Sequence, residues 1–282
     1  IMCSIWGYYR HLFRRHLLSG RMLSVLVLTA LTMDAFLVGL RSYCYDTGAR
    51  VSQWGFALLW TNKYVVLSFL LIYVYAVSNF PLDRVRERYS IARMGVARWA
   101  VAHGLYVVGF GWLYTVLLVV LQNLLLCGVM EWSGSWGKGW GALSDISAAV
   151  GVDIYIKAPY RILANFAPLE ANFLVFIIMG LLLGMLGGLV FWLNLYSRAA
   201  GAAAGSFMIF LGVAAVRMKR LLPYSPANWI QLEYHYSMLE PGQPKPGYIV
   251  AILLLLTFFG LVMARRRVER TQENNSPAKK PW

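Results

Sequence analysis

Residues 171–194 read ANFLVFIIMGLLLGMLGGLVFWLN and contain no charged side chain. At about 1.5 Å per residue, a helix of this length crosses the roughly 30 Å of hydrocarbon in a bilayer. A membrane-spanning strand would instead alternate apolar and polar residues over about ten positions. The stretch therefore predicts a transmembrane helix, because a helix makes all of its backbone hydrogen bonds within its own segment, as lipid requires.

Similar apolar runs recur on both sides of this stretch. The whole chain of 282 residues is 59% hydrophobic and 13% charged, with a mean hydropathy of +0.58, which leaves too little polar surface for a soluble globule. We predict an all-α integral membrane protein of six transmembrane helices. The six runs lie near residues 22–40, 56–79, 100–126, 171–194, 199–216 and 248–264.

The net charge of +14 would suggest a nucleic-acid partner in a soluble protein, but in a membrane protein its distribution gives the orientation. With both termini inside, the inner segments hold sixteen basic and four acidic residues, and the outer segments hold nine and seven. This bias obeys the positive-inside rule, apart from the outer cluster Arg217, Lys219 and Arg220. We therefore expect a multi-pass protein of the cell membrane (bacterial inner or plasma membrane), with both termini cytoplasmic and no nucleic-acid partner.

Two inner segments have helical periodicity. Residues 4–20 predict an amphipathic helix on the membrane surface, near anionic lipid headgroups, which acts either as a simple anchor or as a mechanical element. Residues 82–97 follow Pro81, which ends the second span, and predict a short charged helix. Its residues recur at spacings of three and four, so they share a side that either meets a protein partner or is solvated. They are Arg84, Glu87, Arg88 and Ile91.

Two outer segments differ in length and composition. Residues 127–170 are rich in glycine and tryptophan and predict a lid on the outer surface. Residues 217–247 hold Pro223 and Pro226 and predict an interfacial hairpin that dips back toward the membrane. A polar tail, residues 271–282, is expected to be disordered. Residues 1–270 then form a single transmembrane domain.

Small residues repeat every four positions in the fourth and fifth spans, as in Gly180, Gly184 and Gly188. This spacing lets helix backbones approach closely, within one chain or between two copies. We predict a homodimer, with the face bearing Gly201 and Gly205 close to its two-fold axis.

Two ionisable residues lie inside predicted spans, where an unpaired charge is costly. Asp34 in the first span and Lys63 in the second fall at similar depths if both helices are continuous. Because consecutive antiparallel helices are usually neighbours, we predict an ion pair between them. Cys44 and Cys127 both fall near the outer surface, where a disulfide can form, and unpaired thiols are the default expectation.

Motifs of soluble catalysis are missing. The chain has no P-loop, no His-Glu-x-x-His pair and no Gly-x-Ser-x-Gly elbow, and its four histidines are scattered. We therefore expect no enzyme activity, cofactor or metal on this chain.

Taken in order, these features resemble the ATP-binding-cassette type-2 permeases, the membrane subunits of type V exporters. The resemblance covers nearly the whole chain and is one of layout. Its short motifs are Glu87-Arg88, Gly95-Val96-Ala97-Arg98 and the Ser-Pro-x-x-Trp of Ser225 to Trp229. The outer segment 127–170 is longer than is usual for the family.

The resemblance implies that residues 4–20 are a connecting helix and that residues 82–97 are a coupling helix. Through Arg84, Glu87, Arg88 and Arg93, the coupling helix would dock on a separate ATPase subunit, which binds ATP and Mg²⁺. It also implies that two permeases surround a path for an amphipathic peptide, lipid or drug-like substrate. The alternative is a stand-alone membrane protein, such as a secondary transporter or a bacteriocin-immunity protein, although no inverted repeat is evident.

Overall fold

The computed structural model describes residues 5–81, 84–146, 154–197, 199–235 and 244–275. The regular secondary structure in these residues is helical apart from one parallel pair of two-residue strands. Five of the described helices are long and apolar enough to cross a membrane, and a sixth crossing exists if a bent helix pair counts as one span. The chain is thus an all-helical, polytopic membrane protein, as its apolar runs predict.

The chain begins with α1 (Ile5–Leu17) and turns at once into α2 (Gly20–Thr47). Ser19 makes this turn: its hydroxyl donates to the carbonyl oxygen of His16 (2.6 Å) and accepts from the amide of Met22 (3.3 Å), which caps α2. Along α1, Leu12 is buried while Arg10 and Arg14 are exposed, so the predicted amphipathic helix is present.

The residues of the second predicted span, 56–79, form a bent helix pair, which corrects the single continuous helix expected there. A 3₁₀ turn η1 (Gln53–Gly55) leads into α3 (Phe56–Leu59), and the chain then bends by 92° into α4 (Lys63–Val77). Asn62 starts the new helix because its side chain accepts a hydrogen bond from the amide of Tyr64 at 2.9 Å. Four of the residues around the break, Leu58 to Thr61, are mostly apolar, so hydropathy alone does not reveal it.

The remaining long helices are α6 (Val96–Leu126), α9 (Pro168–Asn194), α10 (Ala200–Arg217) and α11 (Pro246–Asn275). A short helix, α5 (Arg84–Met94), precedes α6. Helix α11 continues past the apolar run, so residues 271–275 are helical and not part of a disordered tail. Gln272 and Glu273 are good helix formers, which explains the extension. The rest of the expected tail, residues 276–282, lies outside the described residues.

Helix α9 is the centre of the bundle and packs against α4, α6, α10 and α11. Its glycines permit this. A Cβ atom added to Gly111 of α6 would lie 2.9 Å from the backbone nitrogen of Gly184, and one added to Gly260 of α11 would lie 3.5 Å from the carbonyl carbon of Gly188. The repeated small residues of the fourth span are therefore used for close helix packing within the chain.

One end of the bundle is closed by the segment between α6 and α9. Strand β1 (Val51–Ser52) pairs in parallel with β2 (Met130–Glu131), and α7 (Gly137–Ile146) and α8 (Tyr160–Asn165) follow. The indole of Trp140 donates to the carbonyl oxygen of Ser52 (3.1 Å), and that of Trp136 donates to Phe166 (3.0 Å). The buried Trp140 ring ties the segment to β1, and the buried Trp136 ring ties it to its own end next to α9, so it is a packed cap and not a separate domain.

The segment after α10 consists of three 3₁₀ turns, η2 (Lys219–Tyr224), η3 (Pro226–Asn228) and η4 (Leu232–Tyr234). Asn228 anchors it by donating to the carbonyl oxygen of Gly212 on α10 at 2.7 Å. Pro223 and Pro226 explain why the helices here do not extend beyond short 3₁₀ turns. The expected hairpin is thus a series of tight turns over residues 219–235, and residues 236–243 are outside the described part.

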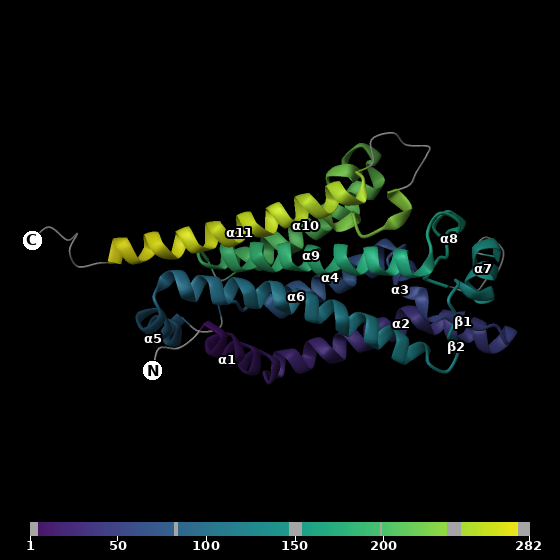
Figure 1. The fold of residues 1–282 in the computed structure, drawn as a ribbon, viewed down its shortest axis with the longest axis horizontal. Coiled ribbons are helices and arrows are strands. Elements are labelled where there is room, and N and C mark those ends of the chain that lie inside the picture. The colour runs from purple at the N-terminus through teal and green to yellow at the C-terminus, as the bar shows by residue number, and fades with distance from the viewer. Residues whose placement is uncertain (1–4, 82–83, 147–153, 198, 236–243, 276–282) are drawn as a thin grey trace, which may run out of the picture.

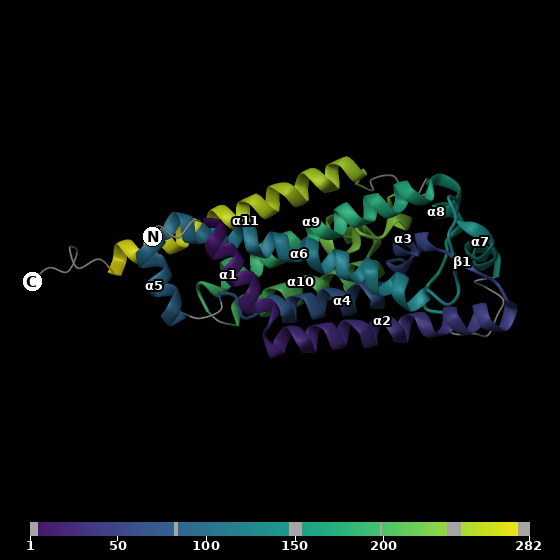
Figure 2. The same ribbon diagram turned by 60° about the horizontal axis from the view of Figure 1, so that its bottom comes forward.

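Figure 1 and Figure 2 show an elongated bundle with two distinct ends. Helix α5, the beginning of α1 and the end of α11 lie at one end, which we call the α5 end. Strands β1 and β2 with α7 and α8 lie at the opposite end, which we call the α7 end. All of α1, including Arg14 and Arg15 in its last turn, lies in the half of the bundle that carries α5, as do the basic residues in the last turns of α11.

Candidate functional site

Helix α5 lies across the α5 end of the bundle and is joined to α6 by a single residue, Gly95 (Figure 2). Gly95 has a φ of +81°, a conformation that residues with a side chain rarely adopt, and its amide donates to the carbonyl oxygen of Ile91 at 2.8 Å. Met94 is buried and Ile91 packs partly against the core. The end of α5 is therefore held in a fixed direction against α6.

The residues expected to couple to a partner lie on this helix. Arg93 is exposed on the last turn of α5. The side chains of Arg84, Glu87 and Arg88 fall outside the part of the chain that the structure describes, as do residues 82–83. The structure therefore places the predicted helix, with bounds 84–94 in place of 82–97, but leaves its charged face as a prediction.

His16 connects α1 to the helices behind it. Its Nδ1 lies 2.7 Å from the hydroxyl of Tyr106 on α6, and its Nε2 lies 3.3 Å from the carbonyl oxygen of Ala76 on α4. Because a carbonyl oxygen only accepts, Nε2 carries the proton and Nδ1 accepts from the Tyr106 hydroxyl. One neutral imidazole thus links three elements at the α5 end.

The environment of His16 keeps the ring neutral. It is buried, with the rings of Phe80 and Phe110 at 4.8 and 4.9 Å between centroids. Burial lowers the pKa of His16 below its ordinary value of 6.5, the hydrogen bond to Ala76 opposes this, and the charge of Arg21 adds to the lowering. The scattered positions of the four histidines in the sequence do not predict this link. The signal was present, since His16 falls three and four residues after Phe13 and Leu12 on the apolar face.

Asp34 has a different partner from the one the sequence suggested. Its carboxylate forms an ion pair with Arg41, two turns further along α2, and the side chains are 45% and 25% exposed. Lys63 instead places its amine over the ring of Tyr64, 5.2 Å from the centroid. The predicted Asp34–Lys63 pair is therefore wrong in this structure, because it assumed a continuous second span. The bend at residues 60–62 puts Lys63 at the start of α4.

Gly201 and Gly205 face the interior of the chain, not a second copy. A Cβ atom on Gly201 would clash with the carbonyl oxygen of Val190 on α9, and one on Gly205 would lie 3.2 Å from Val74 of α4. The amide of Gly201 also donates to the side chain of Asn194 at 2.9 Å. The two glycines thus pack α10 against its neighbours, which corrects their assignment to a dimer axis.

The described residues hold no group of three or more His, Cys, Asp or Glu side chains that could bind a metal ion. Cys44 is buried and Cys127 exposed, and both are free thiols. Comparison with protein families, with curated proteins and with solved structures gives no match. The candidate site is therefore defined by its geometry: α5 and α1 at one end, and the Asp34–Arg41 pair within α2.

Proposed function

We propose that this chain is the membrane subunit of an ATP-driven exporter, with α5 docking on a separate ATPase subunit that binds ATP and Mg²⁺. The observation that carries the proposal is the placement of α5. It is a short helix between two crossings, at the basic end of the bundle, and Gly95 alone joins it to the long helix α6. Any force on α5 would reach a membrane-crossing helix without a flexible linker.

Helix α1 is a second element linked to the helices on either side of α5. His16 ties it to α4 and α6, the two crossings that flank α5 in the sequence. A partner that tilts α5 would therefore also move α1, through α6 and His16. Docking alone does not drive transport, because a partner shifts an equilibrium only through different contacts in its two states.

The Asp34–Arg41 pair supports a polar path through the membrane. Charged residues within spans are rare and usually face a water-filled cavity or a partner helix. Asp34 lies about 21 Å along α2 from Gly20, at about 1.5 Å per residue, yet nearly half of its side chain is exposed. We propose that this face of α2 lines the substrate path, together with a second copy of the permease. The substrate class, an amphipathic peptide, lipid or drug-like molecule, follows from the resemblance alone.

Purification from native membranes under mild detergent tests the proposal. We expect ATPase activity to copurify with the tagged chain, with one ATPase polypeptide for each permease. A pure chain without any nucleotide-hydrolysing partner, but with substrate uptake driven by an ion gradient, would favour a secondary transporter instead. A protein with neither activity would fit the immunity-protein alternative.

A further inference from the structure

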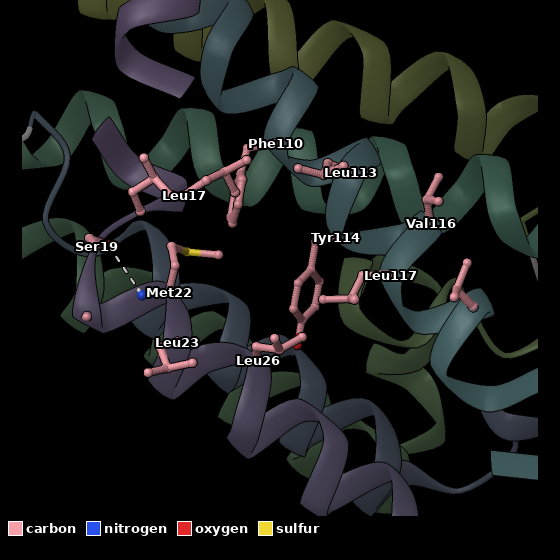
Figure 3. A pocket seen from close by; sticks show the side chains of 13 residues that line it. Leu17, Ser19, Met22, Leu23, Leu26, Phe110, Leu113, Tyr114, Val116 and Leu117 are labelled. Carbon is pink, nitrogen blue, oxygen red and sulfur yellow. Dashed lines mark hydrogen bonds between the residues drawn. The ribbon is translucent and has the colours of Figure 1, made fainter. Parts of the chain in front are cut away.

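A groove of about 610 Å³ runs along the outside of the bundle between the α1–α2 turn and α6 (Figure 3). Its size falls in the range of about 300–1,000 Å³ typical of ligand pockets. Leu17, Met22 and Phe110 gather near one end, and Val116 and Leu117 lie toward the other. Leu23 of α2 and Leu113 of α6 also line it.

The wall of this groove offers no free polar group to a ligand. It has two hydroxyls, and both are used within the protein: that of Ser19 binds the α1–α2 turn, and that of Tyr114 lies 3.1 Å from the hydroxyl of Thr29. All other lining side chains are hydrocarbon or thioether, apart from Gly20. An occupant held here must therefore present hydrocarbon.

The groove is open sideways, toward the space that lipid fills around a membrane bundle. Leu23 is 64% exposed on α2, and Leu113 is 36% exposed on α6. Phe110 and Val120 are ten residues apart on α6, which is about 15 Å at about 1.5 Å per residue. This length matches half of the roughly 30 Å hydrocarbon core, or one leaflet.

Positive charge stands at the α1 end of the groove. Arg14 is exposed and lies one helical turn before Leu18, which is itself 86% exposed and lines the groove. Arg10 and His11 continue the same exposed side, and α1 contains no acidic residue. Arg21 is directed elsewhere, donating to the hydroxyl of Ser78, which follows α4, at 2.7 Å. The mouth is thus complementary to an anion, and the body to a chain of hydrocarbon.

We propose that this groove binds one acyl chain of an anionic phospholipid from the adjoining leaflet, with Arg14 contacting its phosphate. The lipid would lie between α2 and α6, next to the α1–α2 turn, and hold α1 at the membrane surface. This inference does not depend on the exporter proposal, since it needs only a membrane-embedded bundle.

Native mass spectrometry of the full chain in detergent tests it, with palmitoyl-oleoyl phosphatidylglycerol and the matching phosphatidylcholine as probes. We expect one retained phosphatidylglycerol per chain. A basic residue near an anionic surface is worth about 1 kcal/mol, so Arg14→Glu should weaken phosphatidylglycerol binding at least about fivefold and leave phosphatidylcholine unchanged. Leu113→Trp should fill the groove and weaken both lipids.

Matched controls lie on α11. Arg266→Glu changes an exposed arginine at the same end of the bundle, and Leu255→Trp enlarges a residue that is 66% exposed. Both should retain the lipid as the parent does. Equal retention by Arg14→Glu, Leu113→Trp and their controls would overturn the proposal. So would oxidative cross-linking of two copies through Val116→Cys, in a chain whose native cysteines are serine, because a second copy would then cover the groove.

Discussion

His16 on α1 accepts a hydrogen bond from the hydroxyl of Tyr106 on α6, at 2.7 Å. The bond is buried and joins residues ninety positions apart, so it locks the first helix onto the bundle. Loss of one partner leaves a buried polar group unpaired, which costs about 1–3 kcal/mol. We predict that His16→Ala lowers the thermal unfolding temperature in detergent. His11→Ala, an exposed change on the same helix, should alter stability by less than about 0.5 kcal/mol. Equal effects of the two changes would contradict the link.

The same ring predicts a pH dependence. Because burial lowers the pKa of His16 in the folded state, the unfolded chain binds a proton more readily as pH falls below 6.5. The stability contributed by the neutral ring is complete above pH 6.5 and is lost as pH falls toward the lowered pKa. Burial also lowers the pKa of His235, so the informative comparison is with His16→Gln, which retains His235. We expect a shallower loss of unfolding temperature between pH 7 and 5 in His16→Gln than in the parent. Parallel curves would show that His16 does not titrate on unfolding.

Gly201 predicts a steric effect. Its added Cβ would meet backbone of α9, which cannot move aside as a side chain can, so Gly201→Ala should cost about 1–3 kcal/mol. Gly205→Ala meets only valine side chains at 3.2 and 3.3 Å and should cost less. Gly247→Ala has open space at the start of α11 and should be neutral or slightly stabilising. Thermal unfolding ranks the three variants. A change in oligomeric state without loss of stability in Gly201→Ala would restore the dimer assignment.

The ion pair of α2 predicts non-additive mutants. Asp34→Asn and Arg41→Gln should each leave an unpaired charge within the membrane, whereas the double variant leaves none. We expect a coupling energy within the range of about 0.5–3 kcal/mol seen for contacting residues. Lys63→Gln should show no coupling with Asp34→Asn. A double-mutant cycle on unfolding free energy measures both, and coupling to Lys63 instead of Arg41 would reinstate the original pairing.

The long apolar helices were predictable because lipid sets their length and composition. Residues 171–194 and 199–216 match α9 and α10 within a few positions. The helix α5 was also predictable, since Pro81 must end the preceding span and the charges that follow have helical spacing. These features depend on local sequence and on the solvent.

The predictions that were wrong depend on a bend in a helix or on which helix or side chain lies next to a residue. Hydropathy averages over Trp60, Thr61 and Asn62, so the break was invisible and the depth of Lys63 was wrong. Arg41 lies just beyond the first predicted span, residues 22–40, but its long side chain points back along the helix and reaches Asp34. Glycine repeats indicate close packing but do not identify the partner, which for Gly201 is α9 of the same chain.

The role of α5 is tested most directly by replacing Arg84, Glu87, Arg88 and Arg93 with alanine and measuring ATPase retained on the purified chain and substrate transport. Lys279→Ala, a charge in the tail, serves as the matched control. Arg93 is exposed on α5, and the helix is fixed to α6 through Gly95, so loss of its charges should remove the partner without unfolding the bundle. We predict loss of ATPase retention and of transport in the fourfold variant, with both preserved in Lys279→Ala. Retention of both by the fourfold variant would contradict the coupling role of α5 and the exporter function with it.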